Sequence, residues 1–273
     1  MYNDHFGLTR KPFNLSPDPS FLYFTKSHRL ALTMLEYGIQ NESGFTLISG
    51  DVGCGKTTLI RYLLNNLDQH YTVGLISNTH ESFGDLIDLV LLSFDLDYKN
   101  KSNTEKYHTF EEFLLNQYSQ GNNTILIVDE AQNLNPKMLE ELRVISNINS
   151  GKDHVFQIVL SGQPEIRETL RMPELKQFAQ RISSDFHLKP LDLDQLSEYI
   201  KYRLKAAGAK KMLFTQNAIR MIFNFSKGVP RVANTFCDLS LIYAFADGLE
   251  IVDWKTVMAV AIDKKNSGAI GIL

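Results

Sequence analysis

A glycine-rich stretch over residues 50–58, with the sequence GDVGCGKTT, has the composition of a phosphate-binding loop. Gly50, Gly55, Lys56 and Thr57 match the pattern G-x-x-x-x-G-K-[ST] at full spacing, directly after the apolar stretch FTLIS. Such a turn between a strand and a helix points successive backbone N–H groups inward and adds the positive end of a helix dipole. The pattern therefore predicts binding of a nucleoside triphosphate. A glycine-rich turn that binds nothing is the alternative, which the complete pattern in its strand–helix context disfavours.

The residue types within this loop predict separate roles. Lys56 is expected to reach the β- and γ-phosphates of ATP, and the Thr57 hydroxyl is expected to coordinate Mg²⁺. Cys54 occupies a free position of the pattern and is assigned no chemistry. The whole loop is expected to contact the nucleotide, which gives this set of binding residues: Gly50, Asp51, Val52, Gly53, Cys54, Gly55, Lys56, Thr57 and Thr58.

Two adjacent carboxylates end the apolar run in ILIVDEAQNL. Ligands of parallel sheets bind at the carboxyl ends of the strands, so Asp129 is expected to hold Mg²⁺, through water. Glu130 is expected to polarise the attacking water as a general base, which indicates hydrolysis. An acidic turn at a strand end is the alternative. The position about seventy residues downstream of a complete phosphate-binding pattern favours catalysis.

The bulk composition is that of a soluble globular protein. The 273 residues are 44% hydrophobic and 22% charged, enough for one large and one smaller domain. The net charge of -3 disfavours neutralisation of nucleic-acid phosphates as the main task. Cys54 and Cys237 form neither a disulfide framework nor a metal cluster, and they suit a reducing compartment. The sequence has no secretory signal and no apolar run of membrane-spanning length, so a cytoplasmic location is expected.

Strand and helix patterns alternate over residues 27–190. Continuous apolar strands separated by helices predict a parallel sheet covered on both faces. In the first helical pattern, Leu30, Met34 and Ile39 are expected on one apolar face. A later helix is expected to open with a capping box from Thr109 to Glu112, after a polar spacer.

Four consecutive helical patterns follow a boundary near residue 190. Three of them end at Gly208, Gly228 and Gly248, as expected of C-terminal glycines. The first residues are rich in Pro and Phe and predict an irregular arm with apolar anchors. The predicted organisation is an arm (1–26), an α/β nucleotide-binding domain (27–190), a helical lid (191–265) and a tail (266–273). The lone histidines, among them His28 and His108, are expected at the surface.

The ordered motifs resemble those of AAA+ ATPases of the general secretion pathway protein A (ExeA) family, which has relatives among transposition ATPases of the TnsC type. The resemblance covers essentially the whole chain and implies a five-stranded parallel sheet with a four-helix lid. It rests on these stretches: YNDHFGLTRKPFNLSPDPSFLYFTKSHRLALTMLEYGI, SGDVGCGKTT, DEAQNL, LEELRVISN, IVLSGQPEI, QFAQRISSDFHLKPL and KGVPRVANTFCDLSL.

The resemblance also implies three further site residues. Gln163, with Ser161 as the alternative, is the polar sensor at the end of a strand between the phosphate-loop and Asp-Glu strands. Arg231 matches the sensor-2 arginine of the lid, and Arg181 matches the arginine finger that reaches a neighbouring subunit's γ-phosphate. This chain departs from many relatives at Asp185, where they have a second arginine. The family's N-terminal segment packs near the adenine, which implies the same for the arm.

The resemblance implies an ATPase that energises assembly of a type II secretion secretin or a related pilus. The chain is then expected to form a homo-oligomer with the arginine finger acting in trans, and to have an inner-membrane partner. Members with this role carry a transmembrane helix and a periplasmic peptidoglycan-binding region after the ATPase. The chain is therefore expected to be a cytosolic fragment or a shorter member. Two alternatives remain, an ATP-dependent DNA-binding regulator of the TnsC type and a nucleotide-sensing adaptor with negligible turnover.

Overall fold

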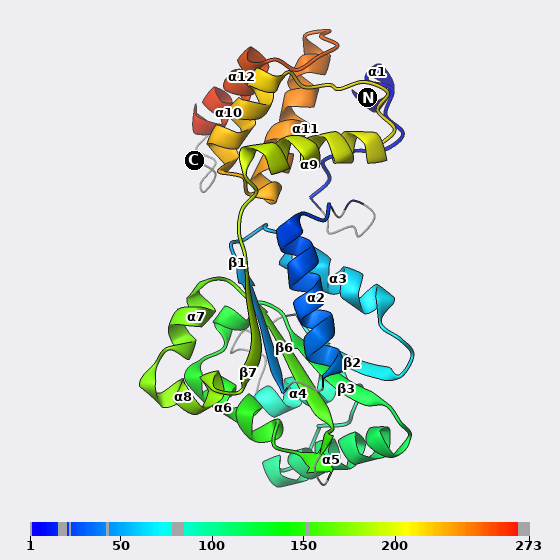
Figure 1. The fold of residues 1–273 in the computed structure, drawn as a ribbon, viewed down its shortest axis with the longest axis vertical. Helices are drawn as coiled ribbons and strands as arrows, with labels where there is room; N and C mark the ends of the chain where they lie inside the picture. The colour runs from blue at the N-terminus through cyan, green and yellow to red at the C-terminus, as the bar shows by residue number, and fades with distance from the viewer. Residues whose placement is uncertain are drawn as a thin grey trace. The chain divides into compact units, whose positions relative to one another are not determined.

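The computed structural model describes residues 2–15, 21, 23–41, 44–77, 85–150 and 153–266. They fall into two compact units (Figure 1). The α/β unit comprises Lys26–Gly50 and Leu59–Leu188, and the helical unit comprises Met1–Thr25, Asp51–Thr58 and Lys189–Leu273. Apart from residue 266, the predicted tail lies outside the described residues, as do residues 1, 16–20 and 22 of the predicted arm.

A five-stranded parallel sheet forms the centre of the α/β unit, as the sequence predicts. Its strand order is β2-β3-β6-β1-β7, and all four pairings are parallel. The interior strands β1, β3 and β6 are buried almost throughout, which explains why they read as continuous apolar runs. The strands are β1 (Phe45–Gly50), β2 (Tyr71–Ile76), β3 (Asn123–Val128), β6 (Phe156–Gly162) and β7 (Ile182–Leu188), with a separate antiparallel pair β4 (Asn149–Ser150) and β5 (Asp153–His154).

Helices pack on the two faces of this sheet. One face of β1, β3 and β6 forms a single apolar core with α4 to α8, and α2 packs on β1 and β7. The helices of this unit are α2 (Lys26–Gln40), α3 (Lys56–Asn66), whose first turn belongs to the helical unit, α4 (Leu86–Ser93), α5 (Asn103–Ser119), α6 (Pro136–Ile145), α7 (Glu165–Leu170) and α8 (Lys176–Ala179), with 3₁₀ turns η3 (Ala131–Asn133) and η4 (Pro173–Leu175).

The predicted apolar face of α2 is correct at Ile39, which is buried, and wrong at Leu30. Leu30 is 50% exposed, and the buried side of the helix carries His28, Ala31, Leu35, Gly38 and Ile39. A Cβ atom at Gly38 would lie 2.4 Å from Oγ1 of Thr46, so the helix lies unusually close to β1 at this glycine. The small residues Ala31 and Gly38 on the buried side of the helix permit this approach. A prediction that looks only for large apolar side chains therefore selects a different face. The expectation that His28 lies at the surface is also wrong, because this residue is buried in the same helix.

The predicted start of α5 is also wrong. The helix begins at Asn103, six residues before Thr109, and it is capped by Ser102. The Ser102 hydroxyl accepts from the backbone N–H of Glu105, and the Glu105 carboxylate accepts from the backbone N–H of Ser102, which forms a complete capping box. Thr109 lies inside the helix and donates to the carbonyl of Glu105.

Four long helices follow the sheet and form the core of the helical unit, as predicted. Leu196, Ile222, Phe236 and Val257 are among the side chains buried in this core, one from each helix. Gly208, Gly228 and Gly248, which follow three of the helices, have positive φ angles and confirm the predicted C-terminal glycines. The helices are α9 (Leu193–Ala206), α10 (Gln216–Ser226), α11 (Pro230–Ala246) and α12 (Trp254–Asn266), with the short α1 (Tyr2–His5) at the N-terminus.

The N-terminal arm is anchored on this helical core. Tyr2, Phe6, Leu8 and Phe13 are buried in it, which confirms the apolar anchors. The buried guanidinium of Arg203 donates to the carbonyl oxygens of residues 12 and 14, at 2.6 and 3.1 Å. In the described part of the chain, no helix combines the length and apolarity needed to cross a membrane.

Candidate functional site

The phosphate-binding pattern forms a tight loop between β1 and the first turn of α3. Gly53 and Gly55 have φ angles of +82° and +99°, which glycine adopts without strain. The loop is closed by two hydrogen bonds to the carbonyl oxygen of Asp51, from the backbone N–H of Cys54 and from Nζ of Lys56, both at 3.2 Å. Side chains of the loop differ in exposure: Asp51 and Val52 are exposed, Thr57 and Thr58 are half-buried, and Cys54 and Lys56 are buried.

The first glycine of the pattern has a packing role. A Cβ atom at Gly50 would lie 2.6 Å from the carbonyl oxygen of Leu188, so β7 leaves no room for a side chain there. Gly50 is thus required by the sheet, independently of any ligand.

Arg231 lies against the loop within the helical unit. It is the second residue of α11, after Pro230, and its backbone N–H donates to the carbonyl oxygen of Gly53 at 3.3 Å. A Cβ atom at Gly53 would lie 2.4 Å from Cβ of Arg231. The structure therefore brings the predicted sensor-2 arginine to the predicted phosphate-binding loop.

Asp129 follows β3 and is held by two donors. Its Oδ1 accepts from the Ser161 hydroxyl at 2.7 Å and from the backbone N–H of Glu130 at 3.0 Å. Ser161 is fully buried near the end of β6, the neighbouring strand. Because the strands are parallel, Asp129 and Ser161 lie at the sheet edge where β1 ends.

Two side-chain amides hold the carboxylate of Glu130. Its Oε2 accepts from Nε2 of Gln132 at 2.7 Å and from Nε2 of Gln163 at 3.4 Å. The backbone of Glu130 is left-handed, with φ 55° and ψ 38°, which is unusual for a residue with a side chain. Non-glycine residues in this region cluster at functional sites. The structure thus joins Gln163 to Glu130 and Ser161 to Asp129.

Sequence reasoning did not single out Gln132. It follows Glu130 by two residues in DEAQ, where it lies in the short turn η3. Its Oε1 accepts from the backbone N–H of Gln163 at 2.9 Å, a contact between positions 31 residues apart. The only signal in the sequence is the presence of an amide next to an acidic strand end.

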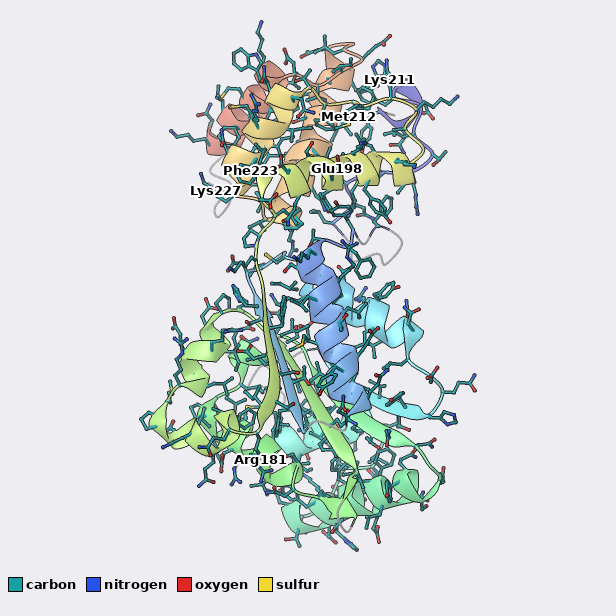
Figure 2. The ribbon with its side chains drawn as sticks, viewed as in Figure 1. Arg181, Glu198, Lys211, Met212, Phe223 and Lys227 are labelled. Atoms are coloured by element: carbon teal, nitrogen blue, oxygen red, sulfur yellow. The ribbon has the colours of Figure 1, made fainter. Side chains whose placement is uncertain are left out.

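Arg181 lies away from these carboxylates within the α/β unit. It precedes β7, at the amino end of the strand, whereas Asp129 follows the carboxyl end of a parallel strand. Figure 2 shows Arg181 beside the turn between α8 and β7. Its guanidinium donates to the Ser146 hydroxyl at 3.2 Å. Arg181 therefore lies at the sheet edge opposite that of Glu130 in the same chain.

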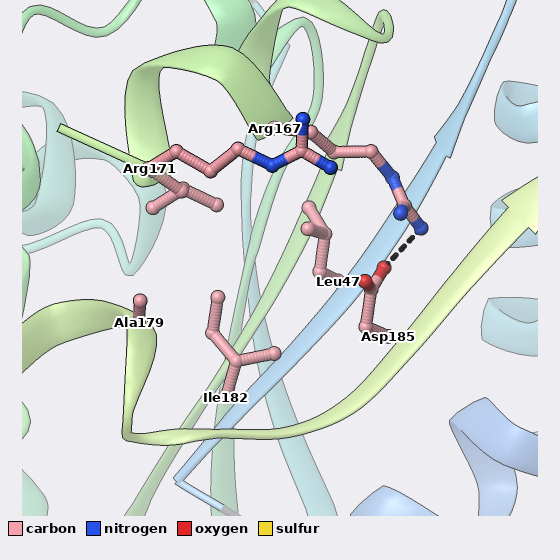
Figure 3. Close-up of a pocket in the computed structure, with 7 residues that line it drawn as sticks. Leu47, Arg167, Arg171, Ala179, Ile182 and Asp185 are labelled. Carbon is pink, nitrogen blue, oxygen red and sulfur yellow. Dashed lines mark hydrogen bonds and ion pairs between the residues drawn. The ribbon is translucent and has the colours of Figure 1, made fainter. Parts of the chain in front are cut away.

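Asp185 forms an ion pair with Arg167 of α7 (Figure 3). Nε of Arg167 also donates to the hydroxyl of Ser49 in β1. These charged side chains border a cavity of about 280 Å³ whose apolar lining includes Leu47, Leu170 and Ile182. None of the predicted nucleotide-binding residues lines this cavity.

Burial of Cys54 in the loop affects its thiol. The side chain is 1% exposed, and burial, with a smaller contribution from the Asp51 charge, raises the pKa of Cys54 to about 11. The thiol is therefore protonated at neutral pH.

Comparison with known proteins supports this description. Residues 39–170 match the model of a family described as an AAA domain. Over 249 residues, which are 91% of this chain, the sequence is 39% identical to General secretion pathway protein A of Aeromonas hydrophila. The chain spans about half, 46%, of the length of that relative.

Solved structures with this fold include the following two proteins. The ORC2 protein of Aeropyrum pernix superposes with a TM-score of 0.67 at 17% identity, covering 92% of this chain and 70% of that one. Cdc6p of Pyrobaculum aerophilum gives a TM-score of 0.68 at 15% identity, covering 88% and 67%. At these identities the likeness concerns the fold alone.

The sheet order, the phosphate-binding loop after β1 and the C-terminal helices define an AAA+ P-loop NTPase. Within this class, the chain is similar to General secretion pathway protein A over 91% of its own length.

Proposed function

We propose that this protein hydrolyses ATP to ADP and phosphate. The observation that carries the proposal is the pair of carboxylates after β3, each of which accepts from at least one side-chain donor of η3, β6 or the residue after β6. Asp129 is held by Ser161, and Glu130 is held by Gln132 and Gln163. A protein that only stores nucleotide has no need of an oriented second carboxylate.

Each group of the proposed site has a role in the reaction. Backbone N–H groups of the loop and Lys56 bind the phosphates, and Glu130 accepts a proton from water as the water oxygen attacks the γ-phosphorus. The bond from the γ-phosphorus to the bridging oxygen breaks, and ADP leaves. The Thr57 hydroxyl and the Asp129 carboxylate are oxygen donors of the kind that Mg²⁺ prefers. When bound, Mg²⁺ neutralises phosphate charge.

Three variants test this activity. Lys56→Ala is expected to lose ATP binding, whereas Glu130→Gln is expected to bind ATP and to lose about a hundredfold or more of the turnover rate. Lys205→Ala, on an exposed part of α9, serves as the control and keeps both properties. Binding is measured by equilibrium titration and turnover by phosphate release with Mg²⁺ present. Equal turnover by the wild type and Glu130→Gln would contradict the proposal.

We further propose that the ATPase acts at the cytoplasmic face of the inner membrane. There it would energise assembly of a cell-envelope machine, either a type II secretion secretin or a related pilus. The support is the 39% identity to General secretion pathway protein A across 91% of the chain. The proposal includes a homo-oligomer and an inner-membrane partner.

A complementation experiment tests this role. In cells lacking the gene, the wild type is expected to restore secretin or pilus multimers, whereas Lys56→Ala and Glu130→Gln are not. Lys205→Ala is the control. If cells with and without the gene contain the same amount of secretin or pilus multimers, and the protein binds duplex DNA in an ATP-dependent and salt-sensitive way, the transposition-regulator alternative is favoured instead.

A further inference from the structure

Gln132 uses both ends of its side-chain amide. Nε2 donates to Oε2 of Glu130 at 2.7 Å, and Oε1 accepts from the backbone N–H of Gln163 at 2.9 Å. A backbone N–H can only donate, so the oxygen of the amide must face Gln163 and its NH₂ group must face Glu130. The donor end of Gln132 is thus committed to the carboxylate.

Gly162 leaves room for the side chain of Gln132 because glycine has no Cβ atom. A Cβ atom at Gly162 would lie 3.2 Å from Oε1 of Gln132 and 3.3 Å from its backbone nitrogen. The end of β6 and the turn η3 are therefore in close contact where the amide passes between them. Packing of this kind restricts the rotamers of Gln132 and keeps its donor on Glu130.

Gln163 contacts the same oxygen of Glu130, over a longer distance. Its Nε2 lies 3.4 Å from Oε2, compared with 2.7 Å for Nε2 of Gln132. Short hydrogen bonds to a charged acceptor are the stronger ones. Of these two amides, Gln132 therefore makes the stronger hydrogen bond to the carboxylate.

We propose that Gln132 is a positioning residue for ATP hydrolysis, which acts by holding the Glu130 carboxylate in the orientation that accepts the proton from water. This inference rests on the proposed ATPase function. Because Gln132 also accepts from Gln163, a displacement of the predicted sensor moves the base both directly and through Gln132.

Two substitutions separate positioning from simple structural support. Gln132→Glu keeps an acceptor for the Gln163 N–H but replaces the donor that faces Glu130, whereas Gln132→Met removes both. Asn133→Ala, an exposed neighbour in the same turn, is the matched control. For each variant, kcat, KM, the equilibrium dissociation constant for ATP and the melting temperature are measured.

Positioning predicts that kcat falls about tenfold or more in both Gln132 variants, because a hydrogen bond to a charged group is lost. The dissociation constant for ATP stays near that of the wild type, and Asn133→Ala behaves as wild type. If the role is structural only, Gln132→Glu retains full kcat while Gln132→Met mainly lowers the melting temperature, which overturns the inference. A wild type that binds ATP but turns over no faster than Glu130→Gln overturns the ATPase proposal itself, and the inference with it.

Discussion

The backbone N–H of Arg231 donates to the carbonyl oxygen of Gly53 over 3.3 Å, and no room is left for a side chain between them. Gly53 occupies a free position in the phosphate-binding pattern, so a nucleotide alone does not require glycine there. Two requirements act together: the φ angle of +82°, and the approach of Arg231 to 2.4 Å from the position that a Cβ would take. The requirement for glycine at position 53 therefore comes from the packing of α11 as well as from the backbone conformation of the turn.

Gly53→Ala is therefore expected to weaken ATP binding by about tenfold or more, because the new methyl group must displace Arg231 and distort the loop. Gly121→Ala is the matched control. Gly121 has a φ of +79°, and no described atom lies within 4 Å of the position of its Cβ. Both variants are expected to lose about 1–2 kcal/mol of unfolding free energy from backbone strain. Isothermal titration with ATP and urea unfolding measure the two effects, and equal ATP affinities for the two variants would contradict the assigned contact.

The position of Arg181 leads to a mixing experiment. Arg181 precedes β7 at the sheet edge opposite Glu130, so an effect on phosphate must come from a neighbouring subunit. Arg181→Ala and Glu130→Gln are each expected to be inactive alone. When mixed, an intact Glu130 in one subunit can meet an intact Arg181 from the next, and ATPase activity is expected to reappear.

Phosphate release by the two variants, separately and at equal concentrations, measures this recovery. Arg171→Ala mixed with the wild type is the control for subunit exchange and is expected to keep full activity, since Arg171 is an exposed residue that borders the cavity. Activity of the mixture no higher than that of either variant alone would rule out the finger in trans.

The sheet could be predicted because its interior strands are buried on both faces and appear as uninterrupted apolar runs. The loop could be predicted because backbone geometry and phosphate chemistry together restrict residue type. Gln132 could not be found in this way. Its function depends on its approach to Gln163, which lies 31 residues further along the chain, and side-chain amides have no characteristic periodicity.

The error at α5 has a different physical cause. Its first two turns are polar, and only Lys106, Phe110 and Leu114 are buried, a stripe too narrow to stand out in the sequence. The Ser102–Glu105 box therefore lies in a segment that looks like a spacer. The cap therefore sets the start of α5 at Asn103, although the first two turns have no apolar pattern.

This cap assignment is directly testable. Ser102→Ala is expected to lower the free energy of unfolding by about 1 kcal/mol, since it removes the acceptor for the backbone N–H of Glu105. Thr109→Ala removes a hydroxyl inside the same helix and is expected to cost less, because alanine is a strong helix former. Urea unfolding compares the two. A larger loss for Thr109→Ala would instead support a helix that begins at residue 109.

Cys54 provides a pH-dependent test of the loop structure. Its pKa is raised to about 11 from an ordinary value of 9.0, and burial also raises the pKa of Cys237 well above its ordinary value. Only the thiolate reacts with iodoacetamide, and at pH 8 about one folded molecule in a thousand carries it at Cys54. Alkylation of Cys54 in the folded protein is therefore expected to be slow at pH 8 and to accelerate about tenfold per pH unit up to about pH 10.

The same shift predicts how stability depends on pH. A raised pKa means that the folded state holds the thiol proton more tightly than the unfolded state does. The protonated Cys54 thiol therefore makes its full contribution to the free energy of unfolding below about pH 9, and this contribution is lost as the pH rises towards 11. Cys54→Ser is expected to flatten this decline relative to the wild type, and Cys237 continues to contribute.

Mass spectrometry of the Cys54 peptide measures the alkylation rate, and urea unfolding at pH 8 and pH 10 measures the stability. Labelling of native Cys54 at pH 8 as fast as in urea would show that the loop does not bury its thiol.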